Sequence, residues 1–248
     1  MRRSNVNTAL RIGCVPYLNA KPLIEGLPDV LLLPPADLVG RLVAGKLDVA
    51  LLPAIEVLRR GLAHVPGLAI ASPGRTESVR LYHKVPVADI RRVALDRNSR
   101  TTNMLTRILL EERYRLKPRY VTRDPSRRLA LDGVDAAVTI GDTSFRREGV
   151  PFLDLGAEWR DFSGRPFVFA LWAFRSGHPR AREIARTLRA AKARGVPRIA
   201  EIARRESKRL GLSTSYATRY LTEWITFDLG PAERAGLRKF GSYARRRP

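Results

Sequence analysis

Short apolar strands alternate with amphipathic helices from the start of the chain. Residues 11–17 and 30–33 have the character of strands, and residues 35–44 have the apolar spacing of a helix. The segment 47–52 (LDVALL) is almost wholly apolar, which is typical of a buried parallel strand, and a second helix follows it at 53–60. Strands and helices that alternate at this interval predict βαβ units around a parallel sheet. We therefore predict an α/β fold.

The middle of the chain repeats this pattern, and the end of the chain is helical. The middle residues predict strands at 93–96, 118–121 and 136–140 and helices at 101–112 and 126–131. The last residues predict helices at 181–194, 198–210, 213–224 and 231–240.

Two extended segments, residues 78–84 and 167–174, bracket the middle block. We interpret them as two crossings between lobes, and residues 167–174 have no partner strand nearby in the sequence. Lobe 1 would then comprise residues 1–83 and 169–248, and lobe 2 would comprise residues 84–168. Open parallel sheets bind ligands outside the carboxyl ends of their strands, so we expect the binding site in the cleft between the lobes.

The composition is that of a globular protein. Hydrophobic residues make up 44% of the 248 positions and charged residues 28%, which argues against disorder. The longest apolar runs fall far short of the roughly 20 residues that a membrane span needs, so we expect no span. The first residues are basic and polar and do not resemble an export signal, and the single cysteine, Cys14, fits a reducing compartment. We therefore expect a cytoplasmic location.

The net charge of +22 raises the question of a polyanionic partner. From Arg175 onward the chain has 19 Lys and Arg against 6 Asp and Glu. A patch of this kind can attract nucleic acid or anionic lipid. However, the arginines are dispersed along amphipathic helices with glutamates between them, and aromatic residues are not interleaved as a stacking platform. A solvated helical surface is favoured, and no specific nucleic acid partner is predicted.

The loop 96–102 combines hydroxyl and guanidinium groups just before a predicted helix. Ser99 or Thr101 would cap the helix, and its first N–H groups would then face the cleft beside Arg100 and Thr102. Such a helix start suits a carboxylate. The residues of this loop fit an ordinary capped helix equally well.

Other polar residues follow predicted strands and would lie at the same cleft. Tyr17 and Asn19 follow the first strand, and Gly141 and Asp142 follow the strand at 136–140, where Asp142 would bind a ligand or cap the next turn. The three histidines lack the spacing of metal ligands, and the sequence has no phosphate loop, dinucleotide-binding glycine motif or nucleophile elbow. The residues alone predict a two-lobed anion binder without metal or cofactor.

Five blocks of the sequence add to this prediction. They are RIGCVPYLNAKPLIEGL at 11–27, LDVALLPAIEVL at 47–58, SVRLYHKVPVADIRRVALDRNSRTTNMLTRILL at 78–110, DAAVTIGDTSF at 135–145 and FLDLGAEWRDFSGRPFVFALWAF at 152–174. In this order, spanning about two-thirds of the chain, they resemble the chorismate dehydratases of the menaquinone pathway. The Ser-rich opening motif of the other enzyme with this fold in that pathway is absent from the sequence. Residues 72–77 depart from the Gly-Pro-Val approach to Ser78 in that family, and Tyr82 and His83 stand where Phe and Ser are more usual.

The resemblance implies a periplasmic-binding-protein-like (type II) fold with a ligand cleft between its lobes. It also implies dehydration of chorismate, a dianion, to 3-[(1-carboxyvinyl)oxy]benzoate, with no cofactor. Asn19 and Ser78, which lie in matched motifs, are expected to be catalytic. The substrate-binding residues that it implies are Tyr17, Ser99, Arg100, Thr101, Thr102, Gly141 and Asp142.

Two questions stay open at this point. No His or Glu within the matched motifs is suited to act as a general base. We hypothesise that the enolpyruvyl carboxylate of the substrate accepts the proton, and Asp142 is the alternative within the protein. A non-catalytic binding protein for a small carboxylate anion is the alternative function, and the sequence does not predict an oligomeric state.

Overall fold

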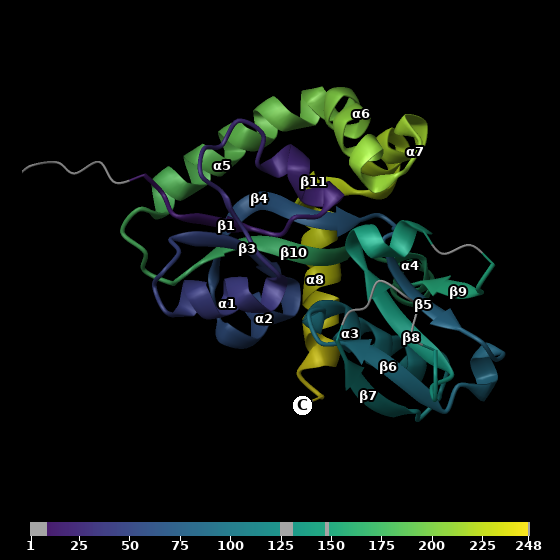
Figure 1. The fold of residues 1–248 in the computed structure, drawn as a ribbon. Helices are drawn as coiled ribbons and strands as arrows, with labels where there is room; N and C mark the ends of the chain where they lie inside the picture. The colour runs from purple at the N-terminus through teal and green to yellow at the C-terminus, as the bar shows by residue number, and fades with distance from the viewer. Residues whose placement is uncertain (1–8, 125–130, 147–148, 248) are drawn as a thin grey trace, which may run out of the picture.

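The computed structural model describes residues 9–124, 131–146 and 149–247, which form two β-sheets covered by helices (Figure 1). The order of strands in the first sheet is β11-β4-β10-β3-β1-β2. Their bounds are β1 (Ile12–Cys14), β2 (Leu31–Leu32), β3 (Val49–Pro53), β4 (Ala63–Ser72), β10 (Phe167–Phe174) and β11 (Thr226–Asp228). β1 is parallel to β2 and β3, whereas β10 runs antiparallel between β3 and β4.

The second sheet is built from the middle of the chain in the order β7-β6-β8-β5-β9. Its strands are β5 (Val79–His83), β6 (Arg92–Asp96), β7 (Arg119–Arg123), β8 (Ala136–Ile140) and β9 (Phe152–Asp154). β6 is parallel to both β7 and β8, and β5 is antiparallel to β8 and β9. The strands predicted at 11–17 and 136–140 thus belong to different sheets, and the predicted two-lobed α/β fold is confirmed.

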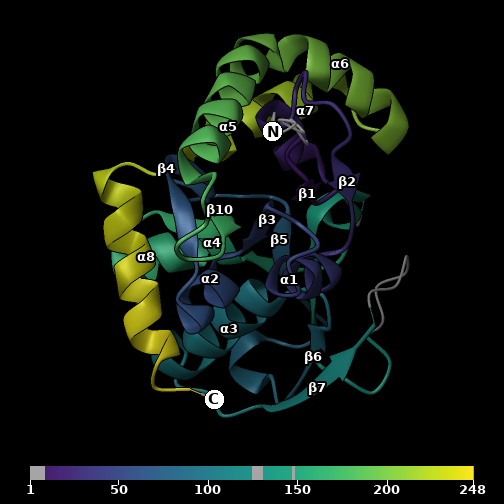
Figure 2. The same ribbon diagram turned by 90° about the vertical axis from the view of Figure 1, so that its left-hand side faces the viewer.

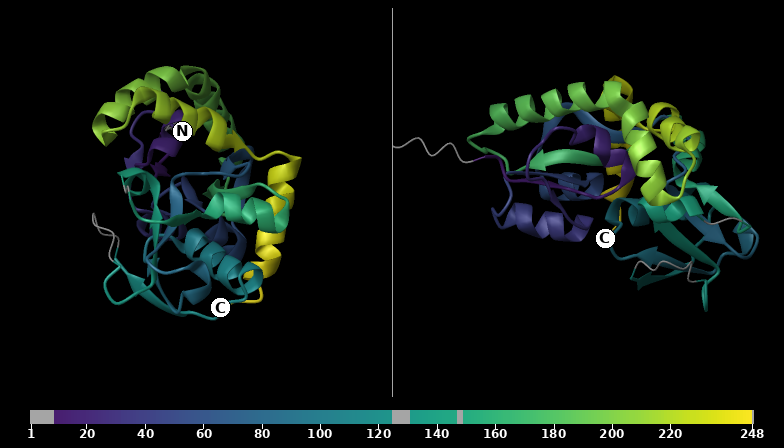
Figure 3. Two further views of the ribbon diagram at one scale, coloured as in Figure 1. Left: turned by 90° about the vertical axis from the view of Figure 1, so that its right-hand side faces the viewer. Right: turned by 45° about the horizontal axis from the view of Figure 1, so that its top comes forward.

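Helices pack on both faces of the first sheet (Figures 1 and 3). The α-helices are α1 (Pro35–Val43), α2 (Ala54–Arg60), α3 (Arg100–Ile108), α4 (Leu155–Ser163), α5 (Ala181–Gly195), α6 (Ile199–Leu210), α7 (Thr214–Arg219) and α8 (Pro231–Ala244). Turns of π-helix extend α3 at Leu109–Arg113 and α7 at Tyr220–Trp224. Short 3-10 helices are formed by Leu18–Leu23, Val87–Asp89, Gly141–Arg146 and Val196–Arg198. No helix in the described part of the chain is both long and apolar enough to cross a membrane.

Several elements were not predicted, and the long strand β4 is the most important of them. β4 pairs with β10 and β11, so it lies inside the first sheet. Pro66 and Gly67 interrupt its sequence, and Gly67 has a φ of +81°. Such residues normally mark a bulge or the end of a strand, and the pairing of β4 with β10 indeed shifts register. The strands β9 and β11 and the helix α4 were also missed. The helix predicted at 126–131 lies outside the described residues, apart from Leu131.

Strand pairing locates the two crossings between the sheets. The chain passes from β4 in the first sheet to β5 in the second, and it returns through α4 to β10. β5 (79–83) is hydrogen-bonded within the second sheet, although the predicted boundary placed residues up to 83 in lobe 1. The division into residues 1–83 with 169–248 and residues 84–168 stays a prediction.

Helix α8 lies along the side of the molecule and contacts elements on both sides of the crossings (Figure 2). Phe240 of α8 packs in one apolar cluster with Ile55 of α2, Phe167 of β10 and residues of the second sheet. Beyond α8, the Arg247 guanidinium pairs with Glu111 and Glu112 in the π-helical extension of α3. The last helix therefore joins the two parts of the fold.

Several basic residues of the last helices form ion pairs. Arg180 binds Glu183 at 2.7 Å, and Arg198 binds Glu201 at 2.8 Å. Lys192 pairs with Asp228 at 2.5 Å. These pairs reduce the positive charge that α5 and α6 present to solvent, although the lack of a nucleic acid partner stays a prediction.

Asp48 ties the start of β1 to β3. Its carboxylate accepts hydrogen bonds from the Arg11 backbone N–H at 2.8 Å and from the Arg11 guanidinium at 2.6 Å. The side-chain hydrogen bond from Arg11 lowers the pKa of Asp48 to about 2, against the effect of burial. The ionised form of Asp48 is therefore favoured in the folded protein.

Replacing Asp48 by asparagine should lower the free energy of unfolding at neutral pH by about 1–2 kcal/mol, because half of the Arg11 side chain is exposed and screened. A carboxylate with a depressed pKa stabilises the fold above its unfolded value of 3.8 and loses this contribution as the pH falls through about 2. Urea unfolding of both proteins should therefore show a difference at neutral pH that is much smaller at pH 2. An equal difference at both pH values would contradict this assignment.

Candidate active site

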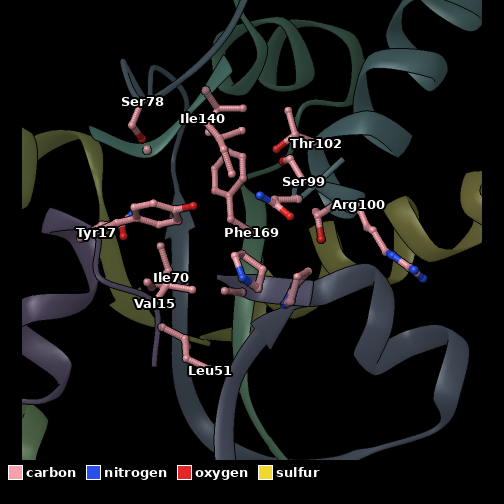
Figure 4. A pocket seen from close by; sticks show the side chains of 18 residues that line it. Val15, Tyr17, Leu51, Ile70, Ser78, Ser99, Arg100, Thr102, Ile140 and Phe169 are labelled. Atoms are coloured by element: carbon pink, nitrogen blue, oxygen red, sulfur yellow. The ribbon is translucent and has the colours of Figure 1, made fainter. Parts of the chain in front are cut away.

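A cavity lies where strand ends from the two sheets meet (Figure 4). It contains about 620 Å³ of empty space, part of which is open to solvent. Its apolar wall includes Val15 after β1, Leu51 of β3, Ile70 of β4, Ile140 of β8 and Phe169 of β10. An apolar lining of this kind is typical of a site for a small organic molecule.

Polar groups line the same cavity. They belong to Tyr17, Asn19, Ser78, Asn98, Ser99, Arg100, Thr101 and Thr102, with Gly141 beside them. In Figure 4, Tyr17 and Ser78 lie on one side of the cavity, and Ser99 and Thr102 lie on the other. Of the nine residues predicted for the site, the fold brings all but Asp142 to this cavity. Their catalytic and binding roles stay predictions.

Asn19 lies in the short 3-10 helix that follows β1. Its side-chain oxygen, Oδ1, is buried and has no hydrogen-bond partner among the described residues. A buried acceptor without a partner costs about 1–3 kcal/mol, so proteins rarely keep one without a use for it. Because Asn19 lines the cavity, a ligand hydroxyl would supply the missing donor.

Ser78 stands at the first crossing, immediately before β5. The hydroxyl of Tyr220 donates to its Oγ at 2.8 Å, and Thr76 Oγ1 lies 3.5 Å away. The backbone carbonyl of Ser78 accepts from the Gly141 N–H at 2.8 Å. Ser78 is therefore fixed through both its backbone and its side chain.

The backbone before Ser78 is held by a buried carboxylate. Asp154, which caps α4, accepts hydrogen bonds from the N–H groups of Thr76 at 3.1 Å and Glu77 at 2.6 Å, in addition to those of its own helix. Glu77 has a φ of +58°, which is uncommon for a residue with a side chain. This clamp holds the strained residue that precedes Ser78, and backbone strain of this kind gathers at functional sites.

Tyr17 and Gly141 form one wall of the cavity. The ring of Tyr17 lies directly against Gly141, where an added Cβ atom would come within 2.8 Å of the ring. Gly141 also has a φ of +64°, a conformation that favours glycine. Burial, reinforced by the charges of Asp96 and Asp142, raises the pKa of Tyr17 to about 12. Tyr17 therefore acts as a neutral hydrogen-bonding group.

The start of α3 forms the opposite wall. Ser99 is the N-cap residue, but its side chain makes no capping hydrogen bond. Thr101, which was the other predicted cap, lies inside the helix, and its hydroxyl oxygen accepts the Ile55 N–H at 3.2 Å. The Thr101 hydroxyl can still donate its own proton. The first N–H groups of α3 have no acceptor within the helix, as at every helix start, and this arrangement favours an anion.

Arg100 begins α3 and lines the cavity. The guanidinium pairs with Glu56 of α2 at 2.9 Å, and in Figure 4 it points away from the cavity. Burial would raise the pKa of Glu56, but hydrogen bonds from Arg60 and Arg100 outweigh burial and lower it. Arg100 thus links α3 to α2, and Glu56 neutralises its charge.

Asp142 is also occupied by protein partners. Its carboxylate accepts the Leu18 N–H at 2.9 Å and pairs with Arg209 of α6 at 3.0 Å. Burial raises the pKa of Asp142, and these two contacts oppose the rise. Asp142 does not line the cavity, and it connects the end of β8 to elements beside the first sheet.

Sequence reasoning missed two polar residues of this region, Asn98 and Tyr220. Asn98 lies in the predicted loop 96–102 and could have been included with its neighbours there. Tyr220 comes from the far end of the chain, and no local signal connects it to Ser78. Among the described residues, no group of three or more His, Cys, Asp and Glu side chains is placed to hold a metal ion.

The fold and the cavity define a binding-protein-like α/β protein with an apolar site that has hydroxyl and amide groups at its edge. The family model for menaquinone biosynthesis matches residues 10–246, and the chain belongs to this family. Chorismate dehydratase from Thermus thermophilus is 31% identical over an alignment of 255 positions, which covers 92% of this chain and 93% of that protein. The predicted resemblance to the chorismate dehydratases of the menaquinone pathway is therefore confirmed.

Solved structures agree on the fold. Protein AF1704 from Archaeoglobus fulgidus has a TM-score of 0.78 at 17% identity, covering 96% of this chain and 97% of that one. The periplasmic aliphatic sulphonate binding protein SsuA from Escherichia coli has a TM-score of 0.59 at 19% identity, covering 96% and 87%. At these identities the likeness concerns the fold alone, and it confirms the periplasmic-binding-protein-like prediction.

Proposed function

We propose that this protein is a cytoplasmic chorismate dehydratase, a hydro-lyase that converts chorismate to 3-[(1-carboxyvinyl)oxy]benzoate and water. Membership of the menaquinone biosynthesis family and the similarity to a chorismate dehydratase support this function. The buried, unpartnered Oδ1 of Asn19 carries the proposal, since a ligand that brings a hydrogen-bond donor into the apolar cavity would satisfy it. Chorismate has such a donor in its ring hydroxyl.

The cavity suits the other parts of chorismate as well. The ring would pack against apolar side chains such as Ile70 and Phe169. One carboxylate would lie at the start of α3, where hydroxyl and N–H groups can donate to it. Arg100 is the one charged residue among the described residues that line the cavity, and Glu56 already binds it. The anion would therefore be held by neutral donors.

Dehydration needs positioning more than strong acid–base groups. The ring carbon that bears the ether oxygen loses its proton, and the electrons of that C–H bond form a new ring double bond. The neighbouring C–O bond breaks, and the departing hydroxide takes up a proton to give water. Aromatisation drives the reaction, so the protein has to orient the breaking bonds and stabilise the departing hydroxyl.

The proposed base is the enolpyruvyl carboxylate of the substrate. Asn19 and Ser78 would fix its orientation and contact the leaving hydroxyl, since an amide and a hydroxyl can each donate and accept. Tyr17 stays protonated because its pKa is about 12, so it would serve as a donor. Asp142 is disfavoured as the base, because the Leu18 N–H and Arg209 occupy its carboxylate.

Replacing Asp142 by asparagine should therefore leave kcat within about threefold of the wild-type value. The asparagine oxygen can still accept the Leu18 N–H, and the lost ion pair with the half-exposed Arg209 contributes little. Removing a true general base costs on the order of 100-fold to 10,000-fold. Steady-state turnover of chorismate distinguishes the two cases, and a loss of the larger size would establish Asp142 as the base.

A genetic experiment tests the function in cells. The gene is expressed in a bacterium that makes menaquinone by this route and whose own chorismate dehydratase has been deleted. We expect growth without added menaquinone from the wild-type protein and none from Asn19→Ala produced at the same level. Failure of the expressed wild-type protein to restore growth would count against the proposal.

A further inference from the structure

Tyr220 occupies an unusual place beside the candidate catalytic residues. It is 1% exposed and begins the π-helical turn Tyr220–Trp224 that extends α7. Its hydroxyl donates to Ser78 Oγ at 2.8 Å across a sequence separation of 142 residues. Turns of π-helix inside α-helices occur often at functional sites.

The donor in this hydrogen bond is Tyr220. Burial raises the pKa of Tyr220, so the phenol keeps its proton and can donate it to Ser78 Oγ.

This direction has a consequence for Ser78. Because Ser78 Oγ accepts from Tyr220, the Ser78 proton is free to point to another acceptor. Thr76 Oγ1 is 3.5 Å away, which is the outer limit for a hydrogen bond, so the cavity is the better direction.

We propose that Tyr220 is a positioning residue that fixes the hydroxyl of Ser78 as a donor toward the substrate. This inference rests on the proposed function, since it assigns a role in the same reaction. The substrate class is a cyclic carboxylate with a ring hydroxyl next to an ether oxygen.

The ring of Tyr220 is held independently of its hydroxyl. It packs edge-on against Phe145 at 5.0 Å between centroids and contacts Trp224 at 6.5 Å. These contacts need only the ring, so Tyr220→Phe should keep the packing and remove the hydrogen bond alone. Tyr120→Phe is a suitable control. The Tyr120 hydroxyl donates to Glu111 at a distance of 3.1 Å, and Tyr120 does not line the cavity.

A double-mutant cycle on chorismate turnover tests the inference. Tyr220→Phe should lower kcat about tenfold to a hundredfold with little change in KM or melting temperature, while Tyr120→Phe should keep the wild-type kcat. In the Ser78→Ala background, Tyr220→Phe should cost no more than about twofold, because the group that it positions is gone. An unchanged kcat in Tyr220→Phe, or the same loss with and without Ser78, would overturn the inference.

A crystal structure of Tyr220→Phe gives a second readout that does not depend on turnover. If the wild-type protein does not convert chorismate, the proposed function fails, and the Ser78 side chain then decides the positioning role. We expect Ser78 Oγ to adopt another rotamer once its donor is removed. A Ser78 rotamer identical to that of the wild-type protein would overturn the positioning role even then.

Discussion

Replacing Asn19 by alanine should lower kcat for chorismate by about a hundredfold to a thousandfold while the protein stays as stable as before. Losses of this size follow the removal of one preorganised hydrogen-bonding group in other enzymes. The stability should not fall, because Oδ1 of Asn19 is buried without a partner and its removal relieves that cost. A gain in melting temperature together with a loss of activity would be the mark of a functional residue.

Asn19→Asp is a second variant that tests the role of the same position. It is nearly isosteric, but it replaces the N–H donor by a negative charge next to a dianionic substrate. We expect it to lose kcat as strongly as Asn19→Ala and to weaken substrate binding further. Turnover and melting temperature are measured on the same preparations of each variant. A structural role would give the opposite result, in which stability falls and turnover per folded molecule is kept.

Gly141→Ala should damage both the fold and the site. Alanine at this position has to adopt a φ of +64°, which costs about 1–2 kcal/mol for a residue with a side chain. The added methyl group would also stand 2.8 Å from the Tyr17 ring, so this ring has to move out of the cavity wall. We expect kcat/KM for chorismate to fall at least about tenfold, because misplaced binding groups impair positioning.

Gly133→Ala is the matched control for this prediction. Gly133 has the same φ of +64°, but nothing lies within 4 Å of the position that its Cβ atom would take. The two variants should lose similar stability from backbone strain, and only Gly141→Ala should lose activity. Equal activity of the two variants would show that the contact between Tyr17 and Gly141 is unimportant for turnover.

The elements that the sequence predicted well are those with a clear local pattern. The apolar run LDVALL gives β3, and the alternation around it gives the parallel part of the first sheet. β4 was missed because Pro66 and Gly67 interrupt its pattern, although its partners on both sides hold it in the sheet. Tertiary pairing overrides local preference in that strand.

The candidate site likewise contains features that the sequence predicted and features that only the fold shows. Short polar residues at strand ends, such as Asn19 and Ser99, lie at the cavity because the topology of parallel strands puts them there. The charged residues Arg100 and Asp142 were reasonable candidates for anion chemistry by type. Their partners, Glu56 and Arg209, come from distant segments, and only the folded chain shows that these charges are already paired.

These distant pairs also connect the two sides of the cavity. Arg100 with Glu56 and Thr101 with the Ile55 N–H join α3 to α2, and Asp142 with Arg209 joins β8 to α6. The walls of the cavity are therefore fixed relative to each other. This arrangement suits a reaction in which orientation matters more than a charged catalyst.

Conversion of chorismate by the purified wild-type protein tests the central claim most directly. We expect chorismate to be consumed with the appearance of a benzoate ultraviolet spectrum and a product lighter than chorismate by one water in mass spectrometry. Asn19→Ala at the same concentration should form this product far more slowly. Tight binding of chorismate by the wild-type protein without any product would contradict the account and would favour a non-catalytic binding protein for a small carboxylate anion.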